Sequence, residues 1–143
     1  MTMNVTRNAG KDPGRHQAFF VVPAVAAATA TQTNVIWIAP DAVQVLGVEV
    51  AAGAAVTGDN TDSKNLNLID AGTGAGTTEV GNLDLVTGTN LTAKTPRAIV
   101  DADAGTGSAF RLDAGDGLAL QTELVGSGVD VPNLLVRITY RFN

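Results

Sequence analysis

The sequence contains no cysteine, a single histidine (His16) and few aromatic residues, which make up 4% of its 143 residues. Without cysteine, neither a disulfide nor thiolate chemistry is available. A lone histidine cannot by itself build a histidine-based zinc site, and it disfavours a Ser-His-Asp triad. The serines in Gly/Asp/polar surroundings, Ser63, Ser108 and Ser127, therefore have no histidine base within the body of the chain. We predict that the protein is not an enzyme.

Charge is scarce as well, at 16% of residues against about 25% in an ordinary domain, and it is unevenly placed. Residues 1–16 contain Arg7, Lys11 and Arg15 against one aspartate, whereas the rest of the chain has six basic and thirteen acidic residues. An acidic body disfavours nucleic acid as a partner, because phosphate binding needs a concentrated positive field. The short basic arm either contacts an acidic partner or is a solvated tail.

Long hydrophobic runs are missing too. The longest, residues 18–30, is interrupted by Pro23 and Thr29 and is too short and too rich in alanine to cross a bilayer. The N-terminus lacks the order of a secretory signal, in which charges precede an apolar block and a cleavage site. We therefore expect a soluble protein that is made in a cytoplasm and has no membrane partner.

What the sequence does contain is a series of short runs in which apolar and polar residues alternate, separated by Gly, Asp and Pro. Eight or nine such strands, with turn signals between them, predict an all-β fold: an antiparallel β-sandwich of jelly-roll or Greek-key type. We expect one such domain over residues 17–143, preceded by an extended N-terminal arm over residues 1–16. The expected strands are 19–22, 34–38, 42–50, 65–70, 80–86, 92–100, 109–112, 118–125 and 134–142.

The alternation within these strands also predicts which side chains form the core. The pattern changes phase at Gly47, as it does at a β-bulge. In the strands with the most regular alternation, every second residue should face the interior. The expected core is Trp37, Val45, Leu68, Leu85, Leu120, Val136, Ile138 and Tyr140.

Two loop patterns have a functional and a structural interpretation. Residues 72–77 (GTGAGT) resemble a phosphate-binding loop, but they lack its Gly-Lys-Ser/Thr and precede a strand, which favours a hairpin turn. Loop aspartates occur in pairs that could bind calcium, yet Asp also caps tight turns. We expect no metal ion and no cofactor. These pairs are Asp59 with Asp62, Asp101 with Asp103, and Asp113 with Asp116.

Arg137 and Arg141 lie on the outer face of the last expected strand. Two residues four apart on a strand share one face. The face is either solvated, with local ion pairs, or an interface, where arginine is enriched.

Several segments together carry a resemblance to a known family. They are Val35-Ile-Trp-Ile-Ala-Pro40 followed by residues 42–50, Leu66-Asn-Leu-Ile-Asp70, Leu83-Asp-Leu-Val-Thr-Gly88, Ala114-Gly-Asp-Gly-Leu-Ala-Leu120 and Asn133-Leu-Leu-Val-Arg-Ile-Thr-Tyr140. With them, the chain resembles the small capsid decoration (cement) proteins of tailed bacteriophages. The resemblance implies a β-sandwich or jelly roll without catalytic residues, often trimeric, whose N-terminal arm reaches neighbouring capsid subunits.

The resemblance also implies a function. It makes the chain a structural virion protein, made in the host cytoplasm, that binds the outside of an assembled capsid and stabilises the shell across subunit joints. Its partners would be the major capsid protein and further copies in a homotrimer. The expected partner-binding residues are Arg7, Lys11, Arg15, Arg137 and Arg141.

Two other functions remain open. The alternative is a carbohydrate-binding or adhesion module of a phage fibre or a cell surface, which would need exposed aromatic residues that this chain has in short supply. A calcium-dependent hydrolase or lyase is the third hypothesis, and it lacks the aromatic platforms of a sugar cleft.

Overall fold

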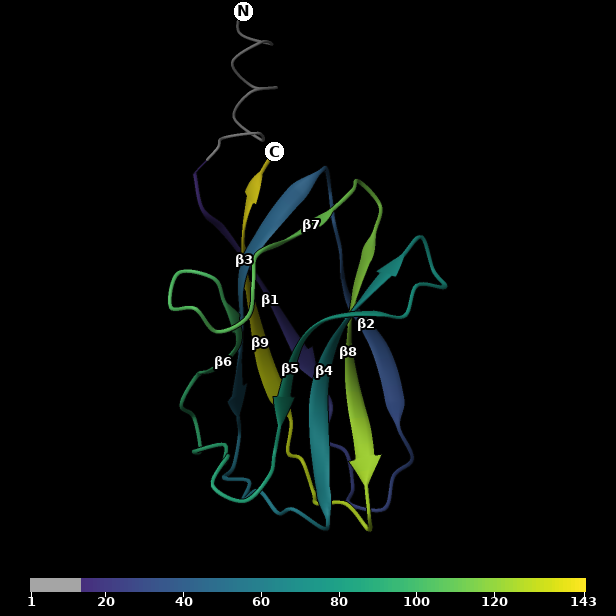
Figure 1. The fold of residues 1–143 in the computed structure, drawn as a ribbon, viewed down its shortest axis with the longest axis vertical. Helices are drawn as coiled ribbons and strands as arrows, with labels where there is room; N and C mark the ends of the chain where they lie inside the picture. The colour runs from purple at the N-terminus through teal and green to yellow at the C-terminus, as the bar shows by residue number, and fades with distance from the viewer. Residues whose placement is uncertain (1–13) are drawn as a thin grey trace, which may run out of the picture.

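The computed structural model describes residues 14–143, so Arg7 and Lys11 lie outside the described residues. Within them the chain forms nine strands and no helix (Figure 1). Accordingly, this part of the chain has no helical segment of the length and hydrophobicity needed to cross a membrane. The strands are β1 (His16–Val22), β2 (Gln32–Ile38), β3 (Val43–Ala52), β4 (Ser63–Gly72), β5 (Thr78–Asp84), β6 (Arg97–Asp101), β7 (Phe110–Leu112), β8 (Gly117–Val125) and β9 (Leu134–Phe142).

The strands form two antiparallel sheets that pack face to face. Sheet 1 has the order β1-β9-β3-β6, with the short β7 also paired to β3, and sheet 2 has the order β2-β8-β4-β5 (Figure 1). The pairing runs in reverse order along the chain: β1 with β9, β2 with β8, β3 with β6, and β4 with β5. The chain is thus one long antiparallel ribbon, doubled back at β4 and β5 and rolled into two layers. The expected all-β antiparallel sandwich is confirmed.

Local sequence explains most strand boundaries. The β3–β9 register shifts between Val45 and Gly47, which confirms the bulge expected at Gly47. The hairpin between β4 and β5 turns through residues 72–77, where the Gly74 amide donates to the Ala71 carbonyl at 2.9 Å. The turn interpretation of this glycine-rich loop is therefore confirmed.

The strand β6 is much shorter than expected. Residues 92–96 were expected to be extended, but β6 begins only at Arg97. The segment before it turns: the Thr95 amide donates to the Thr92 carbonyl at 3.1 Å, and Lys94 has a φ of 59°. Pro96 has no amide hydrogen to donate to a neighbouring strand, and the pairing of β6 with β3 starts only after it, at Arg97.

The core lies between the sheets and consists of inward-facing Val, Leu and Ile. Six of the eight expected core residues are buried: Val45, Leu68, Leu85, Leu120, Val136 and Ile138. The other two, Trp37 and Tyr140, are partly buried and pack against the core. In β2 the register shifts between Val35 and Trp37, so Ile36 takes the buried position.

Trp37 and Tyr140 instead contact each other at one end of the sandwich, with ring centroids 4.8 Å apart. His16 stacks on Tyr140 at 5.5 Å, and Phe142 meets Tyr140 edge to face at 5.7 Å. This aromatic cluster joins the first strand, the second strand and the last strand.

Candidate functional site

The outer face of sheet 1 gathers most of the residues that the sequence singles out. On β9, Arg137 and Arg141 alternate with the inward-facing Val136, Ile138 and Tyr140, so both arginines point away from the core, as expected. Arg137 lies directly opposite Glu49 of β3, and their side chains form an ion pair. The pair is about one-third exposed, so solvent screens it and it contributes little to stability.

Beside this ion pair the face is hollowed to a volume of about 500 Å³. Gly47 and Thr139 pair with each other across β3 and β9 and line the hollow. Because Gly47 has no side chain, the face is open at this point. The lining residues are Arg15, Gln17, Leu46, Gly47, Glu49, Val100, Asp101, Asp103, Ala104, Arg137 and Thr139.

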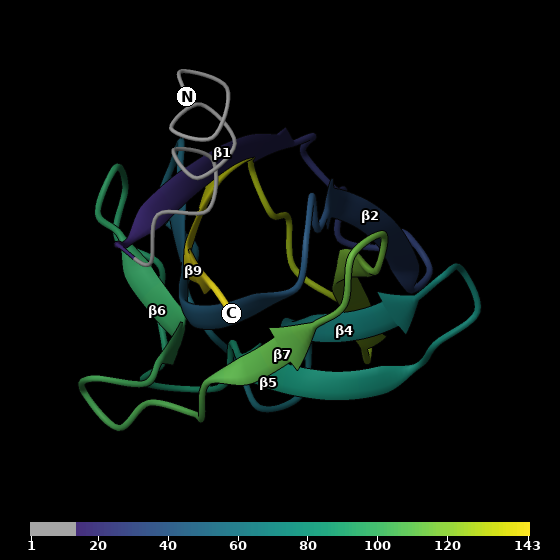
Figure 2. The same ribbon diagram turned by 90° about the horizontal axis from the view of Figure 1, so that it is seen from above.

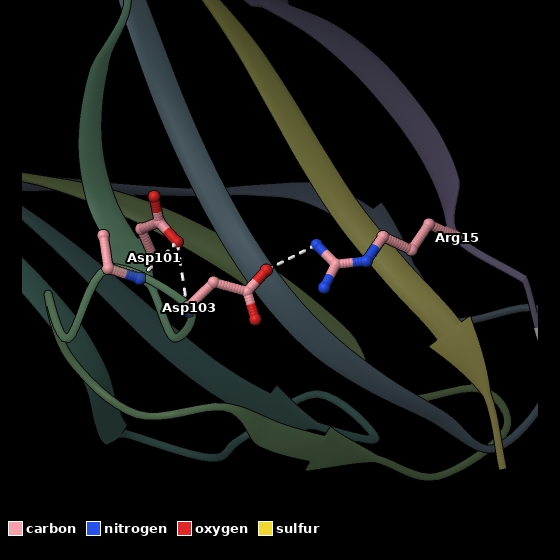
Figure 3. A network of polar contacts seen from close by, with 4 residues as sticks. Arg15, Asp101 and Asp103 are labelled. Carbon is pink, nitrogen blue, oxygen red and sulfur yellow. Dashed lines mark hydrogen bonds and ion pairs between the residues drawn. The ribbon is translucent and has the colours of Figure 1, made fainter.

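Arg15 closes one side of the hollow. Figure 3 shows its side chain extending toward the loop after β6, where Nη1 lies 2.6 Å from Oδ2 of Asp103. Hydrogen bonding and the charge of Asp103 raise the pKa of Arg15, and the same contacts lower the pKa of Asp103. The Asp101 carboxylate accepts hydrogen bonds from the backbone amides of Asp103 and Ala104, both at 3.1 Å, and these bonds hold the loop in place.

The structure thus brings Arg15 and Arg137 to one hollow but leaves Arg141 outside it. Arg141 lies opposite Gln44, and its Nε donates to the Gln44 amide oxygen at 2.9 Å. In the isolated chain, each arginine of β9 bonds to a side chain on the neighbouring strand β3. Whether they also contact a partner stays a prediction.

Sequence reasoning missed an apolar area on the same outer face. Phe19 and Val21 of β1 and Leu135 of β9 are all exposed, and Val21 lies directly opposite Leu135. The signal was present in the sequence: Phe19 and Val21 share parity with the polar Gln17, which places them on the outer face of the strand.

The outer face of sheet 2 carries a row of polar side chains across neighbouring strands. Thr33, Gln121 and Asn67 lie side by side in register on β2, β8 and β4. Asn67 donates to Gln121 at 3.1 Å, and Gln121 donates to Thr33 at 3.0 Å. Asn67 also donates to Glu123 at 3.1 Å. The three residues of the row are uncharged and hydrogen-bond to one another, and Glu123 is their charged neighbour.

Lys64 is a second residue that sequence reasoning missed. It is fully buried, and its Nζ donates to the carbonyl oxygen of Thr29. Burial lowers the pKa of this amine. The period of a strand places it on the same face as Leu66 and Leu68, so the pattern alone could have found it.

The paired aspartates act as turn caps. Asp59 accepts the amides of Thr61 at 2.6 Å and Asp62 at 2.9 Å, and these bonds lower its pKa. Asp116 accepts the amide of Asp113 at 2.9 Å. Within residues 14–143, no cluster of three or more His, Cys, Asp or Glu side chains is arranged to hold a metal ion.

Comparison with known proteins adds a likeness in fold. No protein-family model and no curated protein matches the chain. Among solved structures, a chain from a structure described as the cyanophage Pam1 capsid asymmetric unit is similar, with a TM-score of 0.53 and 18% sequence identity. The similarity covers 91% of this chain and 86% of the other. At this identity the comparison shows that the two chains share a fold.

Proposed function

We propose that the protein is a structural component of a bacteriophage virion that binds the outside of the assembled capsid and stabilises the shell across subunit joints. The observation that carries the proposal is the shared fold with a chain of the Pam1 capsid unit, over nine-tenths of this chain. It agrees with the resemblance to decoration proteins that the sequence segments carry.

The strand topology supports a place in a virion. We propose that the reverse-order pairing of β1 to β9 makes the sandwich a jelly roll, an architecture common in viral capsid proteins and in lectins. The hollow on sheet 1 is lined by two ion pairs, by Asp101 and by uncharged residues. Such a surface is better suited to binding another protein than to catalysing a reaction.

The proposed partner is the major capsid protein, with the decoration protein bound as a trimer. Arg7 and Lys11 of the basic arm would add contacts to acidic or carbonyl-rich capsid surface, and Arg15 lies where the described chain begins. Many weak contacts repeated around a shell sum to firm attachment through avidity.

A carbohydrate-binding module is the second candidate. Thr33 and Gln121 offer hydrogen-bonding groups on the outer face of sheet 2, next to the buried Asn67, and jelly rolls also occur among lectins. This row is engaged in mutual hydrogen bonds, and the exposed aromatic ring of Phe19 lies on the other sheet. A sugar site would bring the two groups together, so we favour the capsid function.

Co-sedimentation with assembled capsids tests the proposal. The purified chain is mixed with capsids of the phage whose genome encodes it, stripped of the native protein, and the capsids are pelleted. We expect saturable binding and capsids that withstand higher temperature once loaded. A chain that stays in the supernatant, yet binds glycans on an array, would replace this function with the carbohydrate module.

A further inference from the structure

The two open sides of the sandwich differ in charge. On one side the edge strands β5 and β6 carry Glu79 and Asp84, and Arg97 and Asp101, respectively. On the other side neither β1 nor β2 contains any Asp, Glu, Lys or Arg. Charged residues on an edge strand normally prevent it from pairing with another chain. The β1 and β2 edges have no such protection.

The exposed apolar side chains gather on the same uncharged side. The described residues include six large hydrophobic residues with exposed side chains, and only Val86 lies elsewhere, in the loop after β5. Scattered exposed apolar residues are ordinary, but a continuous group on one side marks an interaction surface. The other five are Phe19 and Val21 of β1, Val35 and Ile38 of β2, and Leu135 of β9.

These residues form a connected surface because β1 and β2 lie next to each other along one side of the sandwich (Figure 2). A groove of about 250 Å³ runs between the two strands, and Val21 and Val35 both line it. A smaller hollow of about 90 Å³ lies beside Phe19 and Leu135, and its far side is lined by Pro96 and by the Glu49–Arg137 ion pair. We call the apolar area from Phe19 and Leu135 through Val21 to Val35 the β1–β2 surface.

We infer that a second copy of this chain packs on the β1–β2 surface, an inference that rests on the trimer included in the proposed function. Electrostatics selects this occupant. Residues 17–143 have six basic and thirteen acidic side chains, so contacts between the charged parts of two copies mostly bring acidic side chains together, which is unfavourable. The β1–β2 surface is where copies can approach without opposing like charges.

The chemistry of the surface is also self-complementary. Its groove is lined mainly by apolar groups, and the same surface supplies exposed Val, Ile, Leu and Phe side chains that can fill the groove of a neighbour. The centres of stable protein interfaces are depleted in charge in the same way. The basic arm is a poorer match, because Arg7 and Lys11 favour acidic surroundings.

Three valine-to-glutamate variants test the inference, each adding one negative charge. Val21→Glu and Val35→Glu lie on the surface, at side chains 68% and 57% exposed, and Val86→Glu is the matched control at 38%. Light scattering on the full chain at micromolar concentration should give about three times the 14.5 kDa chain mass. We expect Val21→Glu and Val35→Glu to weaken association at least about tenfold, because like charges then face each other. Val86→Glu should match the unmodified chain.

Circular dichroism shows whether each variant is folded. If one of the two surface variants does not fold, the other still tests the inference. A monomeric unmodified chain, or surface variants that associate as Val86→Glu does, would overturn the inference. A monomer that regains the trimer mass when residues 2–13 are deleted would show that the arm covers the surface instead. Co-sedimentation separates the two proposals: a trimer that does not pellet with capsids overturns capsid binding and leaves the interface standing, whereas a monomer that pellets with them overturns the trimer and its interface and leaves capsid binding standing.

Discussion

Arg15 and Asp103 are 88 positions apart in the chain, yet their side chains meet at 2.6 Å over the outer face of sheet 1 (Figure 3). The contact ties the start of the described chain to the loop after β6. Both side chains are more than half exposed. Water and salt therefore screen the pair, and a partner that presents a carboxylate can compete with Asp103 for Arg15.

The first prediction concerns the arm that precedes Arg15. Deleting residues 2–13 keeps β1 intact, removes Arg7 and Lys11, and should weaken capsid binding and flatten its dependence on salt. Co-sedimentation across a salt series measures both effects. Asp103→Asn is the companion variant: it releases Arg15 from its partner within the chain and should bind capsids at least as tightly as the unmodified protein. Equal binding and equal salt dependence of the truncated chain would show that the arm is an idle tail.

The second prediction concerns the faces of β9. Ile138 is fully buried, so Ile138→Ala should lower the free energy of unfolding by about 2–5 kcal/mol. Arg141→Ala, on the outer face of the same strand, should change it by less than about 1 kcal/mol. Urea unfolding followed by Trp37 fluorescence measures both. A larger loss from Arg141→Ala than from Ile138→Ala would mean that the two faces are assigned the wrong way round.

The third prediction concerns the pH dependence caused by Lys64. Its pKa in the folded protein lies below the ordinary 10.5, because burial disfavours the charged amine. As pH rises from the lowered pKa toward 10.5, the unfolded chain binds more protons than the folded one, so stability rises. Below the lowered pKa that gain is lost, since both states are then protonated.

Lys64→Met removes this titration, so the stability difference between the variant and the unmodified protein should shift in favour of the unmodified protein as pH increases. Urea unfolding from neutral pH up to 10.5 gives the difference. Lys94→Met is the matched control, because it replaces an exposed lysine instead of the buried one. A difference that stays constant with pH would contradict the assignment.

The fourth prediction concerns Gly81, where β5 approaches the opposite sheet. A Cβ at this position would lie 2.5 Å from Cγ2 of Val100, a fully buried and stiff side chain. Gly81→Ala should therefore cost about 1–3 kcal/mol of stability through overpacking. At Gly117 the nearest atom to an added Cβ is 3.4 Å away, so Gly117→Ala should be tolerated. Thermal unfolding of the two variants compares them, and equal melting temperatures would refute the close approach.

Much of the fold followed from period-two patterning. The alternation of β9 over Leu134–Phe142 separates buried from outward residues without any long-range information, because successive side chains of a strand point to opposite faces. The bulge at Gly47 and the hairpin turn at residues 72–77 were likewise readable, since both are local devices. The boundary at Arg97 was not, because the turn before it depends on a hydrogen bond from Lys94 to Ala52 of β3.

The sequence by itself determined the class of fold, the direction of each β9 side chain and the opposite charges of arm and body. Only the tertiary structure decided which strands are edges, that Arg15 reaches Asp103, and that Val21 and Val35 line one groove. The physical reason is the range of the interactions. Alternation and turn chemistry act within a few residues, whereas strand order joins segments such as β1 and β9 from opposite ends of the chain.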